Sequence, residues 1–214
     1  LIELIDEANQ EYISFVIIQI DTPGGQVDAL RDLVKSVLNS QTPIITYVGP
    51  QGARSASAGT YLVLSSHIAS MAPATNIGSS TPVLMDGSKP SEDMRNKMIN
   101  DAAAYIKGLA KERGRNAEWA EQSVRESVNI TSEEALELNV IDFIASSIPD
   151  LLTQIDGAAV TIKNNEIIFT TTDVTLIDKS VTDNMTYSIV WIVSGAAMIV
   201  AEFLFSGFIA IFFG

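Results

Sequence analysis

Short apolar runs alternate with helical patterns along the first part of the chain. Residues 13–20, 44–48 and 68–72 are almost wholly apolar, as expected of strands that are buried on both faces of a sheet. Between the first two runs, apolar residues recur at helical spacing from Val27 to Leu38. This βα alternation predicts a mostly parallel sheet with right-handed crossovers.

Further helical patterns follow the third run. Residues 91–112 predict one long helix that ends at Gly114, and residues 117–128 predict a second helix. The sequence Thr131-Ser132-Glu133-Glu134 is typical of a capped helix start, and residues 140–144 have the composition of another strand.

The last part of the chain is rich in apolar and β-branched residues. Residues 158–176 contain many Val, Ile and Thr around Lys163-Asn164-Asn165, which predicts a β-hairpin. Residues 187–214 carry a single charge, Glu202, and predict a transmembrane helix or a helical hairpin. The expected organisation is an α/β domain over 1–156, a β-hairpin appendage or linker over 157–183, and one or more transmembrane segments, truncated, over 184–214.

Composition narrows the chemistry that the chain can perform. Its 214 residues carry a formal net charge of −13, which argues against nucleic acid as a partner. The lack of cysteine excludes disulfides, thiol catalysis and Cys-type zinc sites, and a single histidine, His67, excludes a His-rich metal site. We expect no cofactor, because Gly24-Gly25 lacks the further glycines of a dinucleotide site and the Gly-Lys-Ser/Thr of a P-loop.

Two segments lie where a strand ends and a helix begins, at the sheet edge where ligands bind in open α/β folds. Residues 21–25 (DTPGG) follow the first apolar run, and residues 53–60 (ARSASAGT) follow the second. This arrangement predicts an oxyanion hole that faces a serine nucleophile. The candidate donors are the backbone N–H groups of Gly24 or Gly25 and of Ala58, and the candidate nucleophiles are the two serines of the second segment, Ser55 and Ser57.

A serine nucleophile needs a base within hydrogen-bond reach. His67 lies ten residues after Ser57, on the order of 15 Å away along a helix, so it is better suited to packing at the start of the next strand. The remaining common base is a lysine whose pKa is lowered by burial, and Lys89, Lys97 and Lys107 are the candidates. Helical periodicity does not choose among them, since the apolar stripe of the long helix lies nearly opposite Lys97.

Four motifs in this order resemble the NfeD-type membrane serine proteases of the ClpP/crotonase superfamily. They are DTPGG at 21–25, ARSASAGTYL at 53–62, AYIKGLAKERGRN at 104–116 and TSEEALELNVID at 131–142. The resemblance implies a fold of repeated ββα and βα units, with a first β-strand ahead of this sequence, and the chain is therefore expected to be a fragment.

The resemblance also selects site residues. It makes Ser57 the nucleophile and leaves Ser55 to cap the helix. The family's catalytic lysine stands ten residues before the lysine of the AYIK motif, Lys107, which selects Lys97 as the base. From the residues alone, Lys97 would instead form a surface ion pair with Asp101 at i, i+4.

The function implied by the resemblance is that of a membrane-anchored, ATP-independent serine endopeptidase with a Ser-Lys dyad. Its protease domain would face away from the cytoplasm, and residues 79–90 would form a lid or substrate-contacting loop. The expected partners are hydrophobic segments of stomatin-like membrane proteins, membrane lipid, and a second copy of the chain in a dimer. The alternatives are a crotonase-type acyl-CoA enzyme and a catalytically inert scaffold for stomatin-like proteins.

Overall fold

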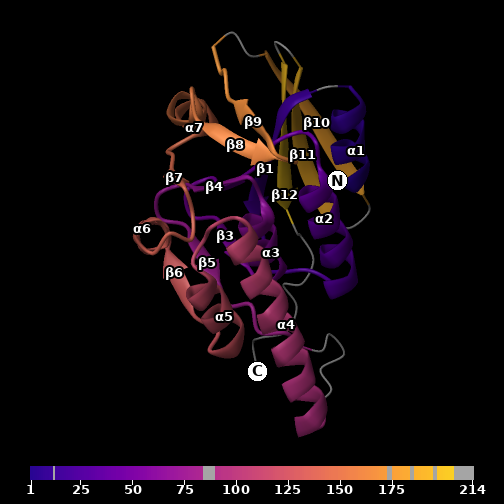
Figure 1. Cartoon of the computed structure of the whole chain (residues 1–214), viewed down its shortest axis with the longest axis vertical. Coiled ribbons are helices and arrows are strands. Elements are labelled where there is room, and N and C mark those ends of the chain that lie inside the picture. The colour runs from indigo at the N-terminus through magenta and orange to yellow at the C-terminus, as the bar shows by residue number, and fades with distance from the viewer. Residues whose placement is uncertain (12, 84–89, 173–174, 184–185, 195–196, 205–214) are drawn as a thin grey trace.

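The structure of the chain, a computed structural model, describes residues 1–11, 13–83, 90–172, 175–183, 186–194 and 197–204 (Figure 1). The helices in these ranges are α1 (Ile2–Gln10), α2 (Val27–Asn39), α3 (Ala58–Ser65), α4 (Glu92–Glu112), α5 (Ala117–Arg125), α6 (Ser132–Glu137) and α7 (Ile148–Ile155). The strands are β1 (Ile13–Asp21), β2 (Ile44–Val48), β3 (Arg54–Ala56), β4 (Ile68–Met71), β5 (Asn76–Gly78), β6 (Asn129–Thr131), β7 (Phe143–Ile144), β8 (Ala159–Ile162), β9 (Asn165–Ile168), β10 (Thr175–Asp183), β11 (Thr186–Ser194) and β12 (Ala197–Leu204).

The central strands follow the predicted parallel arrangement. Strand β4 pairs in parallel with β2 on one side and with β7 on the other. Strand β1 lies beside β2, where the Val16 N–H donates to Pro43 O at 2.8 Å and the Gly49 N–H donates to Ile20 O at 3.1 Å. All five residues of β2 are buried, which explains why its sequence is a continuous apolar run.

A second small sheet lies at the carboxyl ends of β1 and β2. Strand β3 pairs in parallel with β5, and β5 pairs antiparallel with β6. Thr22, just beyond β1, joins this sheet through two backbone hydrogen bonds. Its N–H donates to Arg54 O at 2.8 Å, and its carbonyl accepts from the Ala56 N–H at 3.0 Å. These three-residue strands are too short to leave an apolar period in the sequence, and the sequence analysis did not predict them.

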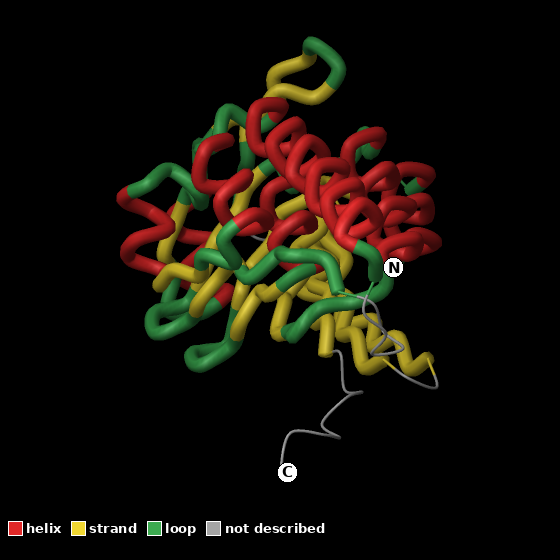
Figure 2. Tube along the Cα trace, turned by 90° about the horizontal axis from the view of Figure 1, so that it is seen from below, coloured by secondary structure: helices red, strands yellow, loops and turns green. Residues whose placement is uncertain are grey.

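Hydrophobic packing covers both faces of the central strands. Figure 2 shows most of the helices gathered on one side of the strands. The larger core on that side contains buried residues of α1 to α5, and the smaller core on the other side joins α7 to β1, β2 and β4. Strand β1 serves both cores, since Val16 faces the first and Phe15 faces the second.

The helix ends largely match their sequence signals. The side chain of Ser91 caps α4 by accepting from the Met94 N–H, and Gly114 takes a positive φ of 66° after its end. Helix α6 begins with the predicted capping box between Thr131 and Glu134. Helix α5 ends at Arg125, earlier than predicted.

A buried arginine joins three parts of the fold that are distant in sequence. The Arg115 side chain is 2% exposed and donates to the carbonyl oxygens of Leu64 and Ser66 at the end of α3, at 3.2 and 2.8 Å. Its other nitrogen contacts Asp142 at 2.6 Å, and that carboxylate also accepts from the Ala69 N–H. The C-terminal ends of the 104–116 and 131–142 motifs therefore meet in one hydrogen-bond network beside the end of α3.

The predicted β-hairpin is present as β8 and β9. Its turn residues Lys163 and Asn164 have positive φ values of 48° and 69°, as a two-residue type I′ turn requires. The segment that follows returns to the body, where Phe169 is 2% exposed and its ring meets that of Phe15 edge to face at 5.3 Å. The hairpin is therefore anchored to the α/β body by aromatic packing.

The C-terminal segment differs from the predicted transmembrane helix over its described residues. Strands β10 and β11 pair antiparallel, and β11 and β12 pair with β1. Abundant Val, Ile and aromatic residues give this segment strand propensity as well as apolar character, and hydropathy alone does not separate the two. Within the described ranges, no helix combines the length and the apolar character that crossing a bilayer needs. Residues 184–185, 195–196 and 205–214 of the predicted segment lie outside the described residues.

Candidate active site

Ser57 occupies a strained backbone position at the start of α3. It is the N-cap residue with φ 52° and ψ −117°, and its hydroxyl makes no capping hydrogen bond. Its N–H donates to Gly78 O at 3.0 Å, and the Thr60 hydroxyl donates to that same carbonyl at 3.0 Å. A positive φ costs a non-glycine residue about 1–3 kcal/mol, so it persists where surrounding bonds fix it, and functional sites are where such strain concentrates.

Ser55, the rival nucleophile, has a different place. It lies in β3, is fully buried, and its Oγ has no hydrogen-bond partner among the described residues. The expectation that Ser55 caps the helix is wrong, because β3 carries this residue inward beneath the turn and Ser57 becomes the N-cap. Of the two serines, Ser57 is the one that lines a cavity.

The glycine turn after β1 closes against Ser57. Gly24 has φ 139°, and a Cβ added there would lie 2.9 Å from the Ser57 Cβ and 3.3 Å from its Oγ. The buried Thr22 hydroxyl holds this turn, since it accepts from the Gly24 N–H and donates to the Gly24 carbonyl, both at 3.1 Å. Only glycine fits at position 24 without displacing the serine.

The three predicted oxyanion donors are therefore not equivalent. The Gly24 N–H is already engaged by Thr22. Gly25 and Ala58 both line the cavity beside Ser57, and Ala58 is the first residue of α3, where a helix leaves its N–H groups without intrahelical partners. Of the three predicted donors, Gly25 and Ala58 are thus the two that line the cavity beside Ser57.

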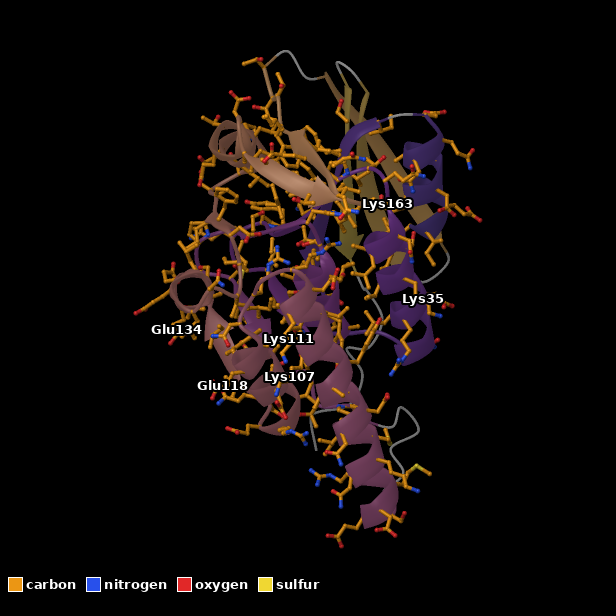
Figure 3. All side chains as sticks on the ribbon, in the orientation of Figure 1. Lys35, Lys107, Lys111, Glu118, Glu134 and Lys163 are labelled. Atoms are coloured by element: carbon orange, nitrogen blue, oxygen red, sulfur yellow. The ribbon has the colours of Figure 1, made fainter. Side chains whose placement is uncertain are left out.

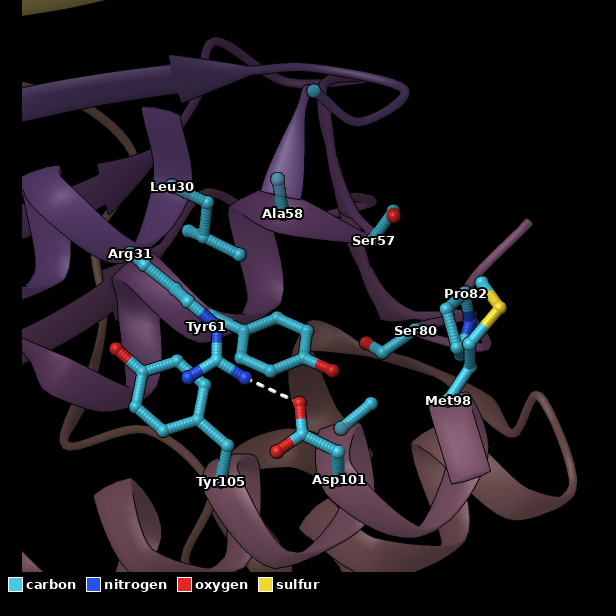
Figure 4. A pocket seen from close by; sticks show the side chains of 12 residues that line it. Leu30, Arg31, Ser57, Ala58, Tyr61, Ser80, Pro82, Met98, Asp101 and Tyr105 are labelled. Carbon is cyan, nitrogen blue, oxygen red and sulfur yellow. Dashed lines mark hydrogen bonds and ion pairs between the residues drawn. The ribbon is translucent and has the colours of Figure 1, made fainter. Parts of the chain in front are cut away.

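The cavity beside Ser57 has a volume of about 130 Å³ and mostly apolar walls (Figure 4). Tyr61 and Tyr105 form one wall, with ring centroids 5.9 Å apart. Burial raises the pKa of both phenols, so their hydroxyls stay neutral at physiological pH. The remaining side chains come from α2, α3, α4 and the segment before residue 83; they include Leu30, Ala58, Pro82, Met98 and Ala102.

One ion pair stands at the edge of this apolar cavity. Arg31 of α2 pairs with Asp101 of α4, and the Arg31 guanidinium lies 4.5 Å from the centroid of the Tyr105 ring (Figure 4). A Lys97–Asp101 ion pair, the alternative to a catalytic Lys97, does not form here, because α2 packs against α4 and brings Arg31 to this carboxylate.

Lys97, the predicted base, is exposed on α4 and is not among the residues that line the cavity. Its neighbour Met98 and the residue one turn later, Asp101, do line it. Successive residues of an α-helix point about 100° apart, so Lys97 lies at the margin of the face that α4 turns to the cavity. Lys97 is held within α4, which begins at Glu92, and its side chain is exposed rather than turned into the cavity beside Ser57.

The other candidate bases are engaged elsewhere. Lys107 contacts Glu121 of α5 at 2.5 Å, and this hydrogen bond, with that of Arg125, lowers the pKa of Glu121 to about 2. Figure 3 shows Lys107 on the side of α4 that faces α5. Lys89 lies outside the described residues, as do the other residues of 84–89 in the expected lid.

His67 is a structural residue at the start of β4. Its ring Nδ1 accepts from the Ile44 N–H at 3.0 Å, and its backbone N–H donates to Ile44 O at 2.8 Å. Burial, together with the nearby positive charges of Arg113 and Arg115, lowers the pKa of His67 to about 3. This histidine is neutral and joins two strands away from Ser57, as its position in the sequence indicated.

Several residues that shape the site were not predicted from the sequence. Thr22 is part of the DTPGG motif and precedes Gly24 by two residues, a spacing that could have indicated a turn stabilised by the threonine hydroxyl. Gly78 and Tyr105 gave no local signal, since their roles depend on contacts with residues far away in the sequence.

The α/β fold places a strained serine and a glycine turn together beside one cavity, and comparison with protein families assigns the chain to a family. The family model of the NfeD1b N-terminal domain matches residues 2–176, and the chain belongs to this family.

Two individual proteins are similar to this chain in sequence. The chain is 43% identical over 151 residues to the membrane-bound protease PH1510 of Pyrococcus horikoshii, and 29% identical over 91 residues to the membrane protein NfeD1b of Bacillus subtilis. These matches cover 70% and 42% of this chain, but only 34% and 20% of the two relatives. The chain therefore spans about a third of the length of the first relative and a smaller part of the second.

Solved structures of 1510-N, a membrane-bound stomatin-specific protease, have the same fold. A lysine-to-alanine variant in complex with a substrate peptide superimposes with a TM-score of 0.72 and 38% identity, covering 79% of each chain. A serine-to-alanine variant gives the same TM-score and identity, covering 80% of this chain and 84% of that one.

Proposed function

We propose that this chain is the proteolytic part of a membrane-anchored, ATP-independent serine endopeptidase. The observation that carries the proposal is the backbone of Ser57, held with a positive φ beside Gly24 and at the mouth of an apolar cavity. Similarity to a protease described as stomatin-specific supports apolar segments of stomatin-like membrane proteins as the substrates.

In the proposed reaction, Ser57 Oγ attacks the scissile carbonyl carbon while Lys97 Nζ takes its proton. The backbone N–H groups of Gly25 and Ala58 donate to the oxyanion, each worth roughly 2.7–4 kcal/mol in the transition state. Collapse of the intermediate breaks the peptide bond, and the leaving amine takes the proton from Lys97. Water then attacks the acyl-Ser57 ester with Lys97 as base, which releases the carboxylate product and restores the serine.

Assignment of Lys97 rests on the family motif and on its separation from the serine. The serine and the lysine exchanged in the two variants of 1510-N are separated by nearly the same number of residues as Ser57 and Lys97. For Lys97 to reach Ser57, the first turns of α4 must unwind or rotate. Catalytic contacts are often formed only with substrate bound, and residues 79–90, just before α4, would act as the lid.

The wider setting is proposed from the same relatives. Both curated relatives are described as membrane proteins, which supports a membrane location with an extracytoplasmic protease domain. On this proposal the apolar segment from residue 184 is an anchor in contact with lipid, and residues 157–183 connect it to the protease domain over 1–156. To meet lipid, the segment would have to leave the pairing of β11 and β12 with β1. A homodimer is the default assembly, and no nucleic acid is involved.

The test is cleavage of an apolar-rich peptide by the whole chain in detergent. We expect Ser57→Ala and Lys97→Ala to lose at least about 1000-fold in kcat/KM, because nucleophile and base act as one unit. Lys111→Ala, which removes an exposed lysine from the same helix, is the matched control and should keep wild-type activity. Residual cleavage by Ser57→Ala would overturn the mechanism, and an inactive wild type that still binds a stomatin-like protein would favour the scaffold.

A further inference from the structure

The cavity beside Ser57 combines apolar walls with one pair of opposite charges. Arg31 and Asp101 both line it, and they come from two helices and lie 70 positions apart in the sequence. The Arg31 side chain is 35% exposed and the Asp101 side chain 70% exposed. Stacking on Tyr105 fixes the guanidinium, so the pair forms a defined edge of the cavity (Figure 4).

The position of the cavity indicates which part of a substrate it would hold. Ser57, Gly25 and Ala58 line it together, so the acyl group attached to Ser57 lies at its entrance. The nearest side chain is that of the substrate residue that precedes the scissile bond. A volume of about 130 Å³ suits one branched aliphatic side chain, since a dry cavity of about 150 Å³ holds a benzene molecule.

Each charge of the pair would alter the preference of this cavity if it stood alone. A guanidinium without a partner presents a fork of donors that matches a carboxylate, and a carboxylate without a partner accepts from an ammonium or guanidinium group. Placing an aliphatic side chain against an unpaired charge removes water from that charge and is unfavourable. Paired with each other, Arg31 and Asp101 leave the cavity without a net charge.

We propose that the Arg31–Asp101 pair determines the charge preference of the cavity, which holds the substrate side chain before the scissile bond. Asp101 neutralises Arg31 and prevents acidic side chains from binding there, and Arg31 neutralises Asp101 and prevents basic ones from binding. Mutual neutralisation makes the cavity selective for uncharged aliphatic side chains. This inference rests on the proposed protease function and adds the residues that set its specificity.

The test uses three peptides that differ only before the scissile bond, where they carry Leu, Glu or Lys. Asp101→Ala should raise the Glu-to-Leu ratio of kcat/KM at least tenfold. Arg31→Met should raise the Lys-to-Leu ratio at least tenfold. The double variant lacks both charges and should gain neither activity, with both ratios within threefold of wild type.

A matched control separates this effect from a general loss of charge. Asp32→Ala also breaks an ion pair of α2, with Lys35 at 3.0 Å, but neither residue lines the cavity, so both ratios should stay as in wild type. Should a variant fail to fold, as judged by circular dichroism, Asp101→Asn removes the charge and keeps the side-chain shape, and Arg31→Gln removes the charge and keeps a polar, shorter side chain. The same changes in ratio are expected of them.

The outcomes distinguish this inference from the proposed function. Wild-type cleavage of the Leu peptide together with unchanged ratios in the Asp101 and Arg31 variants would overturn the inference and leave the protease intact. Equal gains for Glu and Lys in both variants would also overturn it, since they would indicate a looser cavity. A wild-type chain that cleaves none of the three peptides would remove the proposed function and the inference with it.

Discussion

His67, which is partly buried, provides a quantitative test of the fold, because its effect on stability depends on pH. The perturbation is His67→Asn, in which the side-chain oxygen takes the place of Nδ1 and can still accept from the Ile44 N–H but cannot take up a proton. At pH 7 both side chains are neutral in the folded and unfolded states. We therefore expect the free energies of unfolding of wild type and variant to agree within about 1 kcal/mol at that pH.

Acidification should separate the two proteins. The pKa of His67 is about 3 in the folded protein, against an ordinary value of 6.5. Between these two pH values the unfolded chain binds a proton at His67 and the folded chain does not. Wild type should lose stability as the pH falls below 6.5, by about 1.4 kcal/mol per pH unit. Over the whole window the loss attributable to His67 is on the order of 3–5 kcal/mol, a large part of typical domain stability.

The assay is urea unfolding followed by circular dichroism at pH 7, 6, 5 and 4.5. Titration of the 26 Asp and Glu residues affects wild type and variant alike, so the difference between the two curves isolates His67. We expect His67→Asn to become the more stable protein, by about 2 kcal/mol near pH 5. Parallel loss of stability in both proteins down to pH 4.5 would refute the burial of a neutral histidine beside Arg113 and Arg115.

Three further substitutions test other contacts. Gly24→Ala should cut activity at least about 100-fold, measured as peptide cleavage with the circular dichroism spectrum unchanged, because its Cβ displaces Ser57. Arg115→Met should lower the free energy of unfolding by about 3 kcal/mol in a urea titration, since it leaves the α3 carbonyls and Asp142 without their donor. Thr131→Ala should cost about 1 kcal/mol in the same assay through loss of the capping box, and an unchanged midpoint in either case would contradict the assigned contact.

Much of the framework could be predicted because its signals are local. The strand β2 has the bounds that its apolar run indicates, and α4 starts after the Ser91 cap. The hairpin of β8 and β9 follows from Lys163-Asn164, where both residues adopt the left-handed backbone that such a turn needs. Helix α7 was missed although Ser147 and Pro149 supply an N-cap and a first-turn proline, so its signal was available.

The site itself could be predicted only in part, for a physical reason. The glycine turn and Ser57 are placed by strand-to-helix junctions that the sequence reveals. Partners across the site depend on how helices pack: Asp101 meets Arg31, not Lys97, because α2 lies against α4. Periodicity gives the face of a helix to within one or two residues, and at Lys97 that margin separates a cavity position from an exposed one.

The carbonyl of Gly78 gives this site a fixed place in the order of chain synthesis. It accepts the Ser57 N–H at 3.0 Å, while Gly78 itself is packed so closely that an added Cβ would lie 2.2 Å from Val128 O. The strand that supplies this carbonyl, β5, is itself paired with β6, whose residues lie more than 70 positions after Ser57 in the sequence. A nascent or truncated chain that ends before β6 therefore carries the serine but lacks part of the sheet that supports it.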